Sequence, residues 1–210
     1  MEKKFLSRNY WMLSLGLTLA LGLAAPAAAQ DMSSFYVTPK IMASYQTVDM
    51  HTGDERSSVL GFGGSVGSDL SYSTSWPLRL EAEYLYHGNE TFSRPTDCTI
   101  DLSAHSFLAN AFLDLNTDTA LTPYLGGGLG LAYLTDRASY GNATSKGSRW
   151  NFAWDVGGGV AWGLNENLAL DLGYRYMDLG KSHDNDIGGV GYNVSLTAHE
   201  FSLGLRVMGF

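Results

Sequence analysis

The feature that most constrains this chain is an alternation of apolar and polar side chains with a period of two residues. Over residues 78–87, one set of positions holds Leu78, Leu80, Ala82, Tyr84 and Tyr86, and the other holds Arg79, Glu81, Glu83, Leu85 and His87. Because successive side chains of a strand point to opposite faces, this segment predicts a β-strand with one apolar face. A soluble sandwich would bury that face, whereas a membrane barrel would turn it toward lipid and keep the polar face in its lumen.

The N-terminus favours the membrane barrel. Three basic residues precede an apolar run over about residues 12–24, and three alanines stand before Gln30. This order predicts a secretory signal peptide over residues 1–29. The apolar run is short for a membrane-spanning helix. No cysteine follows it that would indicate a lipoprotein anchor. Residues 30–210 have about the length of one domain and show no dividing linker, so we expect them to form one exported domain.

The exported part of the chain is acidic and contains one cysteine. The full chain has 13 Lys and Arg and 21 Asp and Glu, and loss of residues 1–29 removes three basic residues and Glu2, leaving 10 and 20. This excess of acid argues against nucleic acid as a partner. Cys98 is the only cysteine of the chain, so no internal disulfide can form. We expect Cys98 to lie in a loop, as a free thiol or in an intermolecular disulfide.

Eight segments carry the two-residue alternation, and each is long enough to cross a membrane as a tilted strand. They cover residues 35–48, 58–68, 78–87, 102–115, 123–134, 150–163, 168–178 and 193–210. The sequence therefore predicts an all-β fold, an eight-stranded antiparallel transmembrane barrel with up-and-down topology.

The connections between these segments predict the orientation. Four are longer and polar, at about residues 49–57, 88–101, 135–149 and 179–192, and three are shorter, at about 69–76, 116–121 and 164–167. Outer-membrane barrels have short periplasmic turns and longer external loops. We therefore expect the longer set outside the cell and both termini in the periplasm of a Gram-negative bacterium.

The aromatic residues fall near the predicted strand ends, as expected for two interfacial girdles. The predicted outer girdle contains Tyr84, Tyr86, Tyr133, Trp150, Phe152, Tyr174 and Tyr176. The predicted inner girdle contains Phe35, Tyr36, Trp76, Trp162 and Phe210.

Several strand sequences are similar to those of one family. The runs are NAFLDL from Asn110, PYLGGGLGLA from Pro123, WDVGGGVAW from Trp154, LDLGYRYMDLG from Leu170 and HEFSLGLRVMGF from His199. Together they resemble the opacity-type outer-membrane β-barrel family, eight-stranded relatives of the OmpA membrane domain. The resemblance implies a surface protein of the outer membrane that contacts outer-membrane lipid and lipopolysaccharide. During biogenesis its partners would be periplasmic chaperones and the barrel-assembly machinery.

The resemblance also implies that Phe210 is the C-terminal aromatic signal for assembly. Its phase departs from the family pattern, because the apolar residues of the last strand, from Phe201 to Val207, are odd-numbered. A bulge near Met208-Gly209 would restore the phase. The peptidoglycan-binding domain of OmpA is not carried over.

The lumen of an eight-stranded barrel is only just wide enough for its own side chains. Ten charged residues are predicted to form a polar network there: Lys40, Arg79, Glu81, Glu83, Asp114, Asp155, Asp171, Arg175, Glu200 and Arg206. The expected pairs are Arg79 with Asp114, Arg175 with Asp155 or Glu200, and Arg206 with Asp171. Such pairing favours a structural plug over an acidic ion pathway.

No residue pattern supports catalysis or metal binding. The candidates are His183, Asp184 and Asp186 in the fourth loop, and the neighbours His199 and Glu200, which strand parity places on opposite faces. No serine stands beside them in a recognisable nucleophile motif. The spacing of Asp184 and Asp186 resembles half of a calcium loop, but the downstream acidic ligand is missing. We predict no catalytic, cofactor-binding or metal-binding residues.

These observations predict a monomeric outer-membrane surface protein with a structural role and with adhesion or ligand binding in its external loops. Exposed loops on a rigid scaffold commonly carry recognition, and Phe92, Tyr140 and Tyr192 are the aromatic candidates there. The alternative is a narrow porin for small solutes or ions. A lipid A-modifying enzyme is the third hypothesis.

Overall fold

The computed structural model describes residues 34–50, 53–74, 76–94, 98–140, 143–181, 185–186, 191–192 and 195–209. The predicted signal peptide and Phe210 lie outside these residues. The large strands are β1 (Phe35–Met50), β2 (Gly53–Asp69), β3 (Leu78–Arg94), β4 (Cys98–Asp114), β5 (Leu121–Tyr140), β6 (Ala143–Asn165), β7 (Leu168–Lys181) and β10 (Ser195–Met208). A helix of one turn, α2 (Ser71–Thr74), follows β2.

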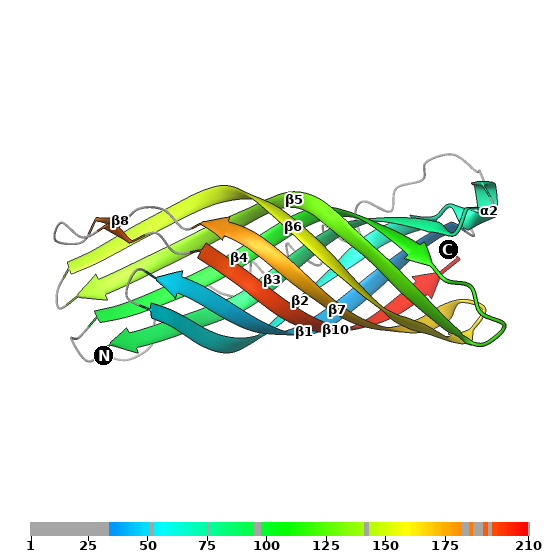
Figure 1. Cartoon of the computed structure of the whole chain (residues 1–210), viewed down its shortest axis with the longest axis horizontal. Coiled ribbons are helices and arrows are strands. Elements are labelled where there is room, and N and C mark those ends of the chain that lie inside the picture. Colours follow the sequence, from blue (N-terminus) through cyan, green and yellow to red (C-terminus); the bar gives the residue numbers. More distant parts are fainter. Residues whose placement is uncertain are drawn as a thin grey trace, which may run out of the picture. The chain divides into compact units, whose positions relative to one another are not determined.

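The eight large strands close into one antiparallel barrel (Figure 1). Their order around the barrel is β1-β10-β7-β6-β5-β4-β3-β2, so the first and last strands pair and close the sheet. The short strands β8 (Asn185–Asp186) and β9 (Gly191–Tyr192) form a separate pair. The predicted eight-stranded antiparallel barrel is confirmed. Within the described part of the chain, no helix is long and apolar enough to cross a membrane.

The two ends of the barrel differ in how the strands are connected. We call one the turn end: β1 begins there, β10 ends there, and it carries α2 and the connections 115–120 and 166–167. At the other end, the loop end, β1 leads to β2, β3 to β4, β5 to β6 and β7 to β10. Figure 1 shows the two ends at opposite extremes of the barrel, with α2 near one and β8 near the other.

The predicted connections agree with the structure at the turn end, where the strands leave residues 70–77, 115–120 and 166–167 between them, and are too long at the loop end. Strands continue through most of the residues predicted to be long loops, and β6 reaches 23 residues. The ladder persists there, as shown by the pairs Asn89 with Ser103 and Arg137 with Lys146, because paired backbone groups keep their hydrogen bonds beyond the apolar segments. Cys98 accordingly begins β4 instead of lying in a loop. The connection after β2 has about the predicted length and contains α2.

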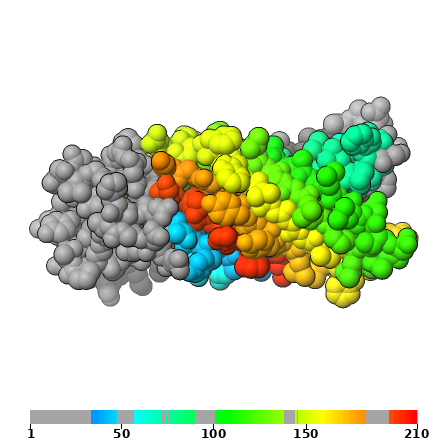
Figure 2. All heavy atoms as spheres, in the orientation of Figure 1, coloured from blue at the N-terminus to red at the C-terminus, as the bar shows by residue number. Residues whose placement is uncertain are grey.

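The apolar faces of the strands point outward. Ile41, Leu125 and Phe152 are each about 60% exposed, at 60%, 63% and 63%, whereas inward positions are buried. Figure 2 shows bands of atoms from β6, β7 and β10 side by side on one face of the barrel. Tyr36 corrects the predicted inner girdle: its side chain is only 3% exposed and points into the lumen.

Glycines on the inward faces of the strands make room for the large lumen side chains. A Cβ atom at Gly157 would lie 2.5 Å from the Cβ of Arg175 on the neighbouring strand. A Cβ atom at Gly159 would lie 2.5 Å from the hydroxyl of Tyr124. Long side chains of some strands therefore fill the interior by packing against the backbone at glycines of neighbouring strands.

Candidate functional site

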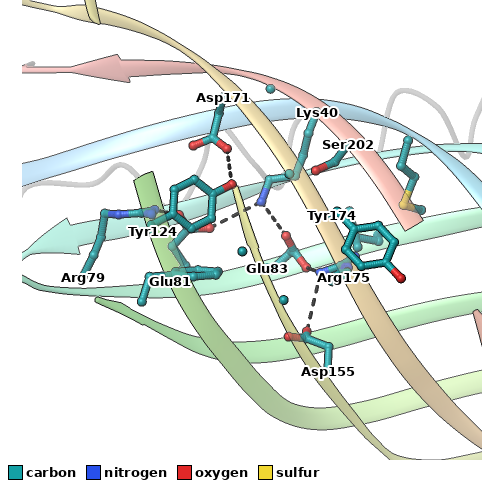
Figure 3. A pocket seen from close by; sticks show the side chains of 17 residues that line it. Lys40, Arg79, Glu81, Glu83, Tyr124, Asp155, Asp171, Tyr174, Arg175 and Ser202 are labelled. Carbon is teal, nitrogen blue, oxygen red and sulfur yellow. Dashed lines mark hydrogen bonds and ion pairs between the residues drawn. The ribbon is translucent and has the colours of Figure 1, made fainter. Parts of the chain in front are cut away.

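The interior of the barrel near the turn end contains the ten charged residues that the sequence analysis placed in the lumen. All ten are buried or half-buried, and Arg79 and Glu200 are each 1% exposed. Eight of them, with the Tyr36 hydroxyl, form one connected set of ion pairs and hydrogen bonds, and Asp171, Arg206 and the Tyr124 hydroxyl form a second set. Figure 3 shows part of both sets around Lys40, Glu83 and Asp171. We call these ten residues and two tyrosines the charged layer.

Arg79 links the carboxylates on one side of the charged layer. Its Nε lies 2.9 Å from Asp114 Oδ2, and its Nη1 lies 2.5 Å from Glu81 Oε1. The Tyr36 hydroxyl donates to the same Glu81 oxygen at 2.9 Å. The guanidinium also lies 4.7 Å from the ring centroid of Phe112, at a distance typical of a cation–π contact. The structure thus brings together Arg79 and Asp114, one of the expected pairs, and adds a second carboxylate.

On the opposite side of the charged layer, Arg175 contacts three carboxylates. Its Nε and Nη2 donate to Glu200 Oε2 at 2.8 and 2.7 Å, and its Nη1 lies 2.5 Å from Glu83 Oε1 and 3.5 Å from Asp155 Oδ2. The two partners that the sequence left as alternatives, Asp155 and Glu200, therefore both contact Arg175. Lys40 Nζ lies 2.5 Å from the other oxygen of Glu83, so the network crosses the lumen.

Asp171 connects the last two members of the charged layer. It accepts a hydrogen bond from Arg206, the partner expected from the sequence, and another from the Tyr124 hydroxyl at 2.5 Å. The layer as a whole holds six carboxylates and four basic side chains, and each of the ten has at least one ion-pair partner. Charges removed from water are tolerated only when they are paired in this way.

A polar group that the sequence analysis missed borders the charged layer on the side of the loop end. His87 Nδ1 lies 2.8 Å from Glu200 Oε1, and His87 Nε2 lies 2.8 Å from Ser106 Oγ. The order Ser, His and carboxylate is that of a hydrolase triad. All three side chains are at most 1% exposed, so no substrate carbonyl can approach Ser106. The arrangement therefore satisfies buried polar groups and does not form an accessible nucleophile.

The half of the lumen toward the loop end is filled differently. Its inward side chains form an apolar cluster that we call the apolar plug: Leu102, Ala104, Leu108, Ala132, Leu134, Ala153, Met177, Leu179 and Leu196. None of them is more than 7% exposed. They share strand parity with the charged residues, so the inward face changes from charged to apolar along the same strands.

The charged layer contains a cavity of about 40 Å³, lined by Lys40, Glu83, Asp155, Arg175 and their neighbours. Cavities that bind drug-sized molecules are roughly 300–1,000 Å³. The cavity has room for water at most, which suits its lining atom Asp155 Oδ2, because that atom is buried without a hydrogen-bond partner in the protein.

The other candidates from the sequence are not assembled into a site. His199 is exposed on the outer face, whereas Glu200 is buried in the lumen, so these neighbours share no contact with a common substrate. His183 and Asp184 lie outside the described residues, and of Asp186 only the backbone in β8 is described. Among the residues whose side chains are described, no group of three or more His, Cys, Asp or Glu could hold a metal ion.

A closed barrel with an apolar outer face and a polar, filled interior defines a transmembrane β-barrel. The chain belongs to the family described as "Outer membrane protein beta-barrel domain", which matches residues 15–208. It is therefore a β-barrel protein of the bacterial outer membrane.

The chain is similar in sequence to an outer-membrane protein and similar in fold to the solved structures of two other proteins. Outer membrane protein PagN of Salmonella typhimurium is 28% identical over 145 residues, which is 61% of this chain and 61% of PagN, so the match covers less than two thirds of that relative. Neisserial surface protein A has a similar fold, with a TM-score of 0.60 and 23% identity over 83% of this chain and 97% of that structure. Ail, the attachment invasion locus protein of Yersinia pestis, solved with the heparin analogue sucrose octasulfate, has a TM-score of 0.54 and 14% identity over 82% of this chain and 99% of that structure. At these identities the two solved structures show that the chain shares their fold.

Proposed function

We propose that this protein is a non-enzymatic surface receptor or adhesin whose sealed barrel holds a recognition surface at the loop end outside the cell. The filled interior carries this proposal. The charged layer occupies the half of the lumen near the turn end, and the apolar plug occupies the other half. An eight-stranded barrel has little further space, which supports a scaffold over the porin alternative.

The loop end is the place where strands extend furthest beyond their apolar segments. The hairpin of β5 and β6 continues past Tyr133 and Trp150 for several paired residues. In outer-membrane barrels the longer extensions face the exterior. We therefore place the loop end outside the cell and the turn end, with both chain termini of the barrel, in the periplasm.

The ligand class that we propose is an anionic glycan. Three basic side chains, Arg137, Lys146 and Arg149, are exposed on the β5–β6 hairpin, and Arg137 and Lys146 are direct partners in the ladder. Like charges placed opposite each other repel, and Asp101, the partner of Arg137 on β4, offsets part of this positive charge. A bound sulfate or carboxylate group would offset the remaining charge of the hairpin. The binding of a heparin analogue by Ail, a relative in fold, suggests the same class of ligand here.

Binding of the protein in lipid nanodiscs to immobilised heparin tests this proposal. We expect binding that weakens with salt, because it depends on exposed charges. The triple substitution Arg137→Gln, Lys146→Gln, Arg149→Gln should reduce the affinity at least tenfold. Lys181→Gln, which removes an exposed basic residue from another strand, is the control and should leave most of the affinity. Absence of heparin binding by the wild type, or full binding by the triple variant, would reject the glycan proposal.

A further inference from the structure

The outer surface of the β3–β4 hairpin carries four aromatic or imidazole rings that we call the first Tyr–His cluster: Tyr84, Tyr86, His105 and Phe107. In the ladder Tyr84 pairs with Phe107, and Tyr86 pairs with His105. The Tyr84 hydroxyl lies 2.9 Å from His105 Nδ1, and the two ring centroids are 6.1 Å apart with an interplanar angle of 24°. The Phe107 centroid lies 5.0 Å from that of Tyr84.

The β7–β10 hairpin carries the same arrangement, the second Tyr–His cluster: Tyr174, Tyr176, His199 and Phe201. The register is the same, with Tyr174 opposite Phe201 and Tyr176 opposite His199. The Tyr174 hydroxyl lies 2.8 Å from His199 Nδ1, the ring centroids are 6.1 Å apart, and the interplanar angle is 22°. The Phe201 centroid again lies 5.0 Å from the tyrosine ring. The same arrangement of tyrosine, histidine and phenylalanine rings therefore occurs on both strand pairs.

The two clusters lie on opposite flanks of the barrel at the same height. The β3–β4 and β7–β10 pairs are four strands apart in the closed order of eight. His105 lies nine residues from Asp114 at the end of β4, and His199 lies nine residues from Met208 at the end of β10. With a rise of about 3.3 Å per residue and a tilt of about 40°, both lie about 23 Å above the turn end. The apolar band of such barrels is about 25 Å tall, so both histidines lie where hydrocarbon meets lipid headgroups at the loop end.

Each cluster presents one polar group to this boundary. The contact between the tyrosine hydroxyl and Nδ1 uses one of the two protons of the pair and leaves the other free. When the hydroxyl donates to Nδ1, the neutral imidazole carries its proton on Nε2. No described residue accepts a hydrogen bond from that Nε2–H of His105 or His199. An unpaired donor is costly beside hydrocarbon. It is stabilised if a lipid oxygen accepts its hydrogen bond, most strongly if that oxygen is anionic.

We propose that each Tyr–His cluster binds one lipid A molecule of the outer leaflet through its phosphate. The Nε2–H of His105 or His199 donates to a phosphate oxygen, and the tyrosine hydroxyl fixes the imidazole in the orientation that presents this donor. Phe107 and Phe201, which are 47% and 62% exposed, pack beside the acyl chains and sugar of the lipid. The barrel therefore carries two lipid A molecules, one on each flank.

Counting bound lipids tests the proposal directly. The full chain, after export and purification, is placed in nanodiscs of phosphatidylcholine that contain either phosphorylated or dephosphorylated lipid A. Native mass spectrometry after ejection from the nanodiscs then counts the lipid A molecules retained per barrel. We expect two with phosphorylated lipid A and none with the dephosphorylated form.

Single substitutions separate the two sites. His105→Leu and His199→Leu, each compatible with an outward apolar face, should each reduce the count from two to one, and the double variant should retain none. Replacement of both histidines by Gln, which keeps an N–H donor, should restore part of the binding. Phe152→Leu alters another exposed outward ring outside both clusters and should keep the count at two. The slower migration of the unheated, folded barrel in gel electrophoresis checks that each variant is folded.

Two results would overturn the proposal. The first is retention of two lipid A molecules by the folded double leucine variant, since another surface would then hold the lipid. The second is equal retention of the phosphorylated and dephosphorylated forms by the wild type, which would mean that acyl chains alone determine binding. Neither result depends on heparin binding at the loop end.

Discussion

The two halves of the lumen fill the same barrel by different physical means. Near the turn end, Arg79 and Arg175 each gather two or more carboxylates, so that every charge removed from water has a partner. Near the loop end, Leu134, Met177 and Leu179 pack with at most 1% of their surface exposed and make no polar contact there. A buried charge that loses its partner is penalised more heavily than an apolar group that leaves a cavity. The charged half should therefore be the more sensitive to single substitutions, while the apolar half should be the better seal.

Removal of Arg175 gives the largest expected effect. Arg175→Ala leaves Glu83, Asp155 and Glu200 without their shared cation, and loss of one partner of a buried pair costs about 3–5 kcal/mol. Urea unfolding in lipid vesicles measures this change in the free energy of unfolding. Adding Glu200→Gln should recover part of the loss, because the two sites are coupled.

The exposed Arg137 provides the control for this experiment. Arg137→Ala removes the same side chain without stranding a buried charge and should change stability by about 0.5 kcal/mol or less. Equal effects of Arg175→Ala and Arg137→Ala would mean that water solvates the charged layer, and the contrast between the two halves would fail.

Truncation in the apolar plug should have the next largest effect. Leu179, which is 0% exposed, packs in the same cluster as the flexible side chain of Met177. Leu179→Ala should destabilise the barrel by the lower part of the usual range of about 2–5 kcal/mol, because methionine adapts to cavities. Leu203→Ala on the outer face, where lipid replaces the lost contact, should cost less in the same unfolding assay. If Leu179→Ala lowers the free energy of unfolding no more than Leu203→Ala does, the apolar plug is loosely packed.

The smallest effect is expected at the inward glycines that make room for the large lumen side chains. Gly157→Ala would place a methyl group 2.5 Å from the Cβ of Arg175, and such overpacking typically costs about 1–3 kcal/mol. Gly163→Ala is the matched control on the same strand, because its nearest contact would be at 3.7 Å. Comparison of the two unfolding midpoints checks the prediction. Unchanged stability of Gly157→Ala would indicate that Arg175 can shift within the lumen.

Strand parity explains how much of this architecture could be predicted. Alternation with a period of two is a local property, so eight strands and the inward direction of residues such as Glu83 and Arg175 follow from the sequence. The ion pair between them joins β3 to β7 across the lumen. That contact depends on barrel closure and on side-chain reach, which no local pattern contains.

The errors have equally specific causes. Tyr36 was placed in the girdle with its neighbour Phe35, although parity directs it inward to Glu81. The apolar plug was missed because leucine and methionine in a membrane barrel are usually interpreted as lipid-facing, even though Met177 and Leu179 share the parity of Arg175. Strand ends were misplaced because pairing beyond the membrane depends on the partner strand, as with Arg137 and Lys146.

Ion conductance in planar lipid bilayers tests most directly the central claim that the interior is sealed. The purified wild-type chain, free of other porins, is inserted and recorded beside a known open porin in the same membranes. We predict no stable conductance steps, because the charged layer and the apolar plug together occupy the lumen. Long-lived steps of constant size from the wild type would contradict the account and favour a water-filled path past Arg175 and the plug.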